Sequence, residues 1–135
     1  MHFYRVKITK HLSERNFLLL AIIWTVLITV ASLVSSSAIP KVNLLWNDKI
    51  VHFLFYLVFV VLWSFANVKS YLKLKYDLLI VVFAIFYGII IEVLQSVLTK
   101  TREADLFDAF ANSLGAIVGF VGFLIVKNKF FNKFF

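Results

Sequence analysis

Apolar residues fill four long segments of the chain, and short polar segments separate them. Each apolar segment is close to the roughly 20 residues that an α-helix needs to cross the hydrocarbon core of a bilayer. With their polar ends included, they predict helices at about residues 17–36, 47–67, 77–98 and 105–127. Because short connections make consecutive helices antiparallel neighbours, we expect an all-α polytopic membrane protein, with four transmembrane helices in one bundle and one domain over residues 1–135.

The composition supports this class and removes others. Hydrophobic residues make up 62% of the chain and charged residues 16%, which argues against disorder and against a soluble globule. The absence of cysteine excludes disulfides and thiolate ligands. Three histidines without an H-E-x-x-H motif give no zinc signature, so the sequence predicts no metal site and no cofactor.

The basic residues predict the orientation. Ten of the 14 Lys and Arg residues lie before the first helix, between the second and third, or after the fourth, and the other two connections hold Lys41, Lys49, Lys100 and Arg102. By the positive-inside rule, both termini are expected in the cytoplasm. Topology and anionic lipid explain the net charge of +7 better than a nucleic-acid partner, because the basic residues lie in separate short segments.

Five of the seven acidic residues gather at the outward end of the predicted helices: Asp48, Glu92, Glu103, Asp105 and Asp108. Carboxylates close to hydrocarbon are unfavourable unless they are paired, and they commonly mark functional sites. For Asp105, capping of the fourth helix is a sufficient explanation.

The second helix carries a polar stripe. Asp48, His52 and Tyr56 recur at four-residue intervals and therefore share one face. Two simpler interpretations stay open: Asn47 or Asp48 caps the helix, and His52 is a packing residue.

Glu92 lies well inside the third apolar segment and shares a face with Gly88 and Gln95. It either serves function or ties helices together by hydrogen bonds. In the fourth helix, the polar pair Asp108 and Asn112 continues into glycines.

These glycines, Gly115, Gly119 and Gly122, extend the stripe at spacings of 3, 4 and 3 residues after Asn112. Small residues on one face let another helix approach closely. With Gly88, they are the predicted helix-packing residues. The helix that packs there is either a neighbour in the bundle or a second copy of the chain, which would make a homo-oligomer through Gly115 and Gly119.

At 1.5 Å per residue, the polar residues of the three helices lie at similar depths, one to two turns below the outer interface. They can therefore form one polar layer, with Lys49 and Arg102 at its rim as partners for Glu92 and Asp108. The predicted ligand-binding residues are Asp48, Lys49, His52, Tyr56, Glu92, Gln95, Arg102, Asp108 and Asn112.

This set resembles the VanZ-like membrane proteins over residues 36–122. The resemblance rests on Asp48-Lys49-x-x-His52-Phe53-x-x-Tyr56, Glu92-x-x-Gln95, Arg102 followed six positions later by Asp108, and Asn112-x-x-Gly115. It implies a small multi-pass protein of the bacterial cytoplasmic membrane. Because the family is named for a member associated with low-level teicoplanin resistance, it also makes antibiotic tolerance an expectation.

Three kinds of function fit this pattern. In the first and favoured one, the outward pocket binds a membrane lipid head group, a lipid-linked cell-wall component or a lipoglycopeptide. In the second, an intramembrane hydrolase or transferase acts on a lipid head group with His52 and Glu92 or Asp108 as base and orienting group. No nucleophile signature supports it. The third, proton or ion movement, finds no chain of ionisable residues in the inward half.

Overall fold

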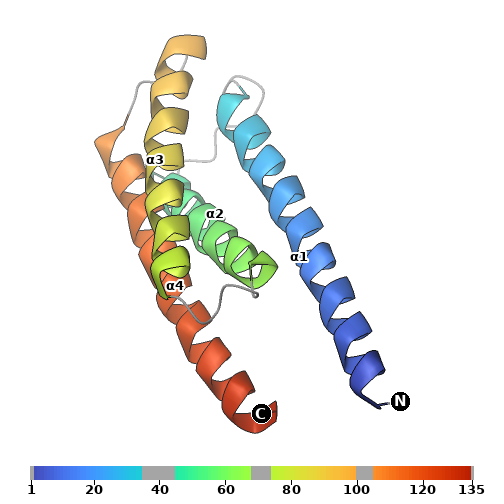
Figure 1. The fold of residues 1–135 in the computed structure, drawn as a ribbon. Helices are drawn as coiled ribbons and strands as arrows, with labels where there is room; N and C mark the ends of the chain where they lie inside the picture. The colour runs from blue at the N-terminus through green and yellow to red at the C-terminus, as the bar shows by residue number, and fades with distance from the viewer. Residues whose placement is uncertain (1, 35–44, 68–73, 100–104, 135) are drawn as a thin grey trace.

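The computed structural model describes residues 2–34, 45–67, 74–99 and 105–134, and the side chains within 15–34, 48–67, 74–99 and 105–129. Its helices are α1 (His2–Leu33), α2 (Leu45–Ala66), α3 (Leu74–Leu98) and α4 (Leu106–Phe134) (Figure 1). The described ranges contain no strand, and each helix holds a segment long and apolar enough to span a membrane. The predicted all-α membrane architecture is therefore confirmed.

The first and the last helix, α1 and α4, are longer than predicted. α1 begins at His2 rather than near residue 17, and α4 continues to Phe134 rather than ending near residue 127. Their apolar parts, Arg15–Leu33 and Leu106–Lys129, are close to the predicted limits. Hydropathy marks where a helix enters the membrane, whereas backbone hydrogen bonding continues through polar residues of adequate helix propensity. Both termini lie at the same end of the molecule (Figure 1), as four antiparallel crossings require.

Glycines allow α2 and α4 to pack closely. A Cβ atom at Gly115 would overlap the carbonyl oxygen of Phe53, and one at Gly119 would lie 2.6 Å from the carbonyl oxygen of Leu57. Gly122 differs, because a Cβ there meets no atom of the described neighbours within 4 Å. The predicted packing stripe thus ends at Gly119. In this structure the helix that packs against Gly115 and Gly119 is α2 of the same chain.

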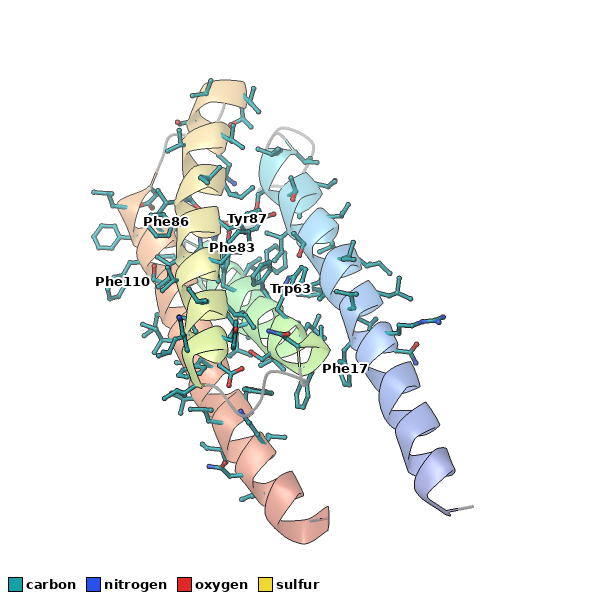
Figure 2. All side chains as sticks on the ribbon, viewed as in Figure 1. Phe17, Trp63, Phe83, Phe86, Tyr87 and Phe110 are labelled. Atoms are coloured by element: carbon teal, nitrogen blue, oxygen red, sulfur yellow. The ribbon has the colours of Figure 1, made fainter. Side chains whose placement is uncertain are left out.

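A core of apolar side chains lies between α2, α3 and α4, with Ile28 reaching it from α1. The rings of Phe59 and Tyr87 stack within it at a centroid distance of 5.6 Å. In contrast, Phe83, Phe86 and Phe110 are each more than 60% exposed (Figure 2). A bilayer provides the apolar surroundings that these outward faces need.

Hydrogen bonds attach α1 to the other helices. Of its described side chains only Ala21, Ile28 and Ser32 are buried. The links include Trp24 Nε1 to the Phe55 carbonyl at 3.0 Å, Trp63 Nε1 to Thr25 Oγ1 at 3.2 Å, and the Thr29 and Tyr87 hydroxyls at 2.6 Å. Trp63 and Tyr87 lie toward α1 in Figure 2. In a membrane, an apolar helix face packs almost equally well against lipid and against protein. Hydrogen bonds between helices therefore help to specify the position of α1.

Candidate functional site

The polar residues of α2, α3 and α4 meet at the end of the bundle opposite the termini. There α2 and α4 begin and α3 ends, because consecutive helices are antiparallel. The buried polar side chains here include His52 at 4% exposure, Glu92 at 4%, Asp108 at 7% and Asn112 at 0%. We call them, with Asp48, Lys49 and Asp105 at their rim, the outer polar cluster.

His52 is the centre of the outer polar cluster. Its Nδ1 lies 3.1 Å from Asn112 Oδ1, and the Asn112 amide nitrogen donates to Glu92 Oε1 at 3.3 Å. Because Asn112 Oδ1 can only accept, His52 Nδ1 carries the proton of this hydrogen bond. The other ring nitrogen, Nε2, faces Asp48 Oδ1 at 3.8 Å and Asp108 Oδ2 at 3.9 Å, which is beyond hydrogen-bond distance.

Glu92 is only partly satisfied. Its Oε1 accepts from Asn112 and lies 3.5 Å from His52 Nδ1. Its Oε2 is buried and has no hydrogen-bond partner among the described residues. A carboxylate oxygen without a donor is costly away from water, so Glu92 has capacity for one more donor.

Lys49 closes the rim on the α4 side. Its ammonium donates to Asp105 Oδ2 at 2.8 Å and to Asp108 Oδ1 at 3.0 Å. Asp105 also caps α4 as predicted, because its Oδ1 accepts from the backbone N–H of Phe107 at 2.8 Å. The Lys49 ammonium and this N–H hold the pKa of the Asp105 carboxyl below its usual value. Lys49 therefore pairs with Asp105 and Asp108, and not with Glu92.

Other predicted residues lie at the edge of the outer polar cluster or outside it. Gln95 turns toward α1 and donates to the Ser32 carbonyl at 2.7 Å. Tyr56 is buried one turn below His52, and its hydroxyl has no partner among the described residues. Asp48 lies within the first turn of α2, which begins at Leu45, rather than in the capping position ahead of it. Arg102 lies outside the described residues.

Gly88 supports the cluster from below. A Cβ there would lie 3.2 Å from both Asn112 Cβ and Tyr56 Cε1, which is tighter than ordinary contact. The absence of a side chain thus lets Asn112 lie against α3 within reach of Glu92.

Two features could not be read from the motif alone. Asp105 is both a cap and the partner of Lys49. At the opposite end, Asp77 is 1% exposed and accepts a 3.0 Å hydrogen bond from Lys127. The sequence signal available for this pair was an acid and a base at the same end of two adjacent spans.

The fold and the cluster together define a four-helix, multi-pass membrane protein with a buried polar centre at one end. A family model described as VanZ/LLP1 matches residues 7–127. The chain therefore belongs to the VanZ/LLP1 family, and the resemblance seen in the sequence is confirmed. No curated protein and no solved structure gave a match.

Proposed function

We propose that this membrane protein binds the polar head group of an amphiphile in the outer polar cluster. The observation that carries the proposal is Glu92 Oε2, an acceptor buried within a membrane helix without a partner among the described residues. An intramembrane carboxylate is retained where it is useful, and a ligand donor would remove the cost of this unpaired oxygen.

The charge balance indicates which head groups fit. The described part of the cluster has four carboxylates, those of Asp48, Glu92, Asp105 and Asp108, and one ammonium, that of Lys49. Since Asp105 and Asp108 already bind this ammonium, the cluster offers acceptors more than donors. A head group with hydroxyl or ammonium donors therefore complements it best.

The basic residues and the family support a bacterial setting, with both termini in the cytoplasm and the outer polar cluster at the outward side. Cysteines introduced at Lys41 and Lys100 should react with an impermeant thiol reagent in intact cells, or in spheroplasts where an outer membrane is present. A cysteine at Ser70 should not, and the reverse labelling would overturn the orientation. The absence of native cysteine gives a clean background.

Lipid retention tests the binding itself. Native mass spectrometry of the purified protein should show preferential retention of phosphatidylethanolamine or phosphatidylglycerol over phosphatidylcholine, whose head group has no N–H or O–H donor. Glu92→Gln and Asn112→Ala should lose the preference. Ser113→Ala is a matched control, because the Ser113 hydroxyl donates to the Ala109 carbonyl of its own helix. Equal retention of all three lipids, or an unchanged preference in Glu92→Gln, would contradict the proposal.

If the bound head group belongs to a lipid-linked cell-wall precursor, the protein would contribute to teicoplanin-type tolerance. Deletion of the gene should then lower the inhibitory concentration of teicoplanin, and wild type but not Glu92→Gln should restore it. Restoration by both would separate tolerance from the cluster.

A second candidate is an intramembrane hydrolase or transferase that acts on the head group. It is favoured by the position of the His52 ring, a candidate base with carboxylate oxygens nearby as candidate orienting groups, Glu92 Oε1 at 3.5 Å and Asp108 Oδ2 at 3.9 Å. Vesicles with radiolabelled head groups distinguish the two candidates. Release of the label by wild type but not by His52→Gln indicates catalysis, whereas saturable retention without release indicates binding.

A further inference from the structure

Three side chains at the rim of the outer polar cluster have the composition of a metal site. Asp48, His52 and Asp108 each offer one ligand atom, and these atoms lie within 4.8 Å of one another. An ion about 2.1 Å from each ligand needs pairs no more than about 4.2 Å apart. His52 Nε2 meets this limit with both aspartates, at 3.8 Å and 3.9 Å. The Asp48 side chain is 50% exposed, so it is free to rotate and close the set.

The hydrogen bond of His52 on its Nδ1 side adds to this indication of a ligand on its Nε2 side. The side chain is 5% exposed, and Nδ1 donates its proton to Asn112 Oδ1. In the neutral ring, the Nε2 lone pair then faces two carboxylates with which it makes no hydrogen bond. A lone pair opposite two anions is repulsive, and a cation between them removes the repulsion. Metal-binding histidines are commonly held in this way, with the second ring N–H donated to an oxygen.

We propose that Asp48, His52 and Asp108 bind one divalent transition-metal ion, which contacts the phosphate of the bound head group. One imidazole nitrogen with two carboxylate oxygens suits Mn²⁺ or Zn²⁺, whereas Mg²⁺ and Ca²⁺ prefer oxygen ligands alone. Asp108 is itself held, because its other oxygen accepts from Lys49 at 3.0 Å. Three protein ligands leave positions open for a phosphate oxygen.

The ion would supply an anion-binding group that the described cluster otherwise lacks. Its ammonium, that of Lys49, is already bound by Asp105 and Asp108. The sequence predicted no metal, because the ligands lie on two helices and match no short motif. The phosphate contact rests on the proposed function, whereas the ion site does not.

Electron paramagnetic resonance with Mn²⁺ tests the ion site on the full-length protein in detergent without added lipid. Wild type should bind one Mn²⁺ per chain, with the ¹⁴N coupling of a directly bound imidazole, and Zn²⁺ should displace it. Asp48→Asn should weaken binding about tenfold or more, in line with the loss of a metal-site group, and His52→Gln should remove the nitrogen coupling. Asp48 lies at the exposed start of α2, so its variant is expected to fold.

The control variant for the ion site is Ser113→Ala, because the Ser113 hydroxyl donates to the Ala109 carbonyl of its own helix and lies outside the ligand set. It should keep the Mn²⁺ affinity within about twofold. Each variant is compared with wild type by circular dichroism and thermal unfolding. Binding well below one Mn²⁺ per chain, binding without nitrogen coupling, or an unchanged affinity in folded Asp48→Asn would each overturn the site.

Lipid retention with and without Mn²⁺ tests the phosphate contact separately. Wild type should retain more phosphatidylglycerol with Mn²⁺ and less with a chelator, and Asp48→Asn should not respond. If Mn²⁺ binds but retention does not depend on it, the phosphate contact is wrong and the ion site stands. If Mn²⁺ binds and none of the three lipids is retained, the proposed function is the part that fails.

Discussion

The two ends of the bundle use ionisable residues in opposite ways. At the end that holds the termini, buried Asp77 pairs with Lys127 at 3.0 Å and joins the start of α3 to α4. At the other end, two carboxylates, those of Asp105 and Asp108, share the ammonium of Lys49, and Glu92 Oε2 has no partner among the described residues. One end has a matched acid and base, and the other has an excess of acceptors.

This difference separates a structural role from a binding role. A buried carboxylate matched with one base has its charge neutralised, so its loss is expected to appear as lost stability. A buried carboxylate with an oxygen that accepts no hydrogen bond already makes the folded state less stable. Its removal is expected to cost binding rather than stability.

The largest effect is expected at the matched end. Asp77→Asn should lower the free energy of unfolding by up to about 3–5 kcal/mol, because it leaves the part-buried Lys127 ammonium without its partner. Adding Lys127→Met should restore most of the loss. Denaturation by SDS in mixed micelles, followed by circular dichroism, measures both variants. If the losses of Asp77→Asn and Lys127→Met simply add in the double variant, the pair does not join these helices. The contrast between the two ends of the bundle would then be wrong.

The next largest effect is expected at the contact between α2 and α4. Gly119→Ala should destabilise by about 1–3 kcal/mol, because its Cβ would meet the Leu57 carbonyl. Gly122→Ala, three residues further along the same helix, meets no described neighbour within 4 Å. It should be neutral or stabilising by up to about 1 kcal/mol through helix propensity. Equal losses in the same unfolding assay would contradict the packing described here.

A smaller effect is expected at the rim of the open end. Asp105→Ala should cost about 1 kcal/mol, since it removes both the cap of α4 and the contact with Lys49. Asp105→Asn keeps a good capping side chain and loses the charge, so it should cost only a few tenths of a kcal/mol. Thermal unfolding of the two variants separates the contributions. A loss for asparagine as large as that for alanine would mean that the cap is unimportant.

The smallest effect on stability is expected for Glu92→Gln, which should stay within about 1 kcal/mol of wild type or gain stability. This is the same carboxylate-to-amide change as Asp77→Asn, made at the other end. The lipid preference measured by native mass spectrometry should nevertheless disappear. A loss of stability as large as that of Asp77→Asn would place Glu92 in the structural class and remove the distinction between the two ends.

The sequence by itself determined the number of membrane helices and which residues share their polar faces. Both are local properties, since hydropathy over about 20 residues marks a span and the helical period marks a face. The cap at Asp105 is local for the same reason, because it acts only two residues along the chain. Comparable depth also follows from local data, through the fixed rise per residue.

Only the tertiary structure decided which polar side chains became partners. Lys49 reaches Asp105 and Asp108, while Gln95 turns away to α1. Each outcome depends on how a helix is rotated about its own axis and on which helix lies beside it. Close packing at glycines and contacts between residues far apart in the chain set that rotation, and Asp77 and Lys127 meet across 50 positions. A one-dimensional pattern gives depth and face, but the neighbour that a face meets is a property of the packed bundle.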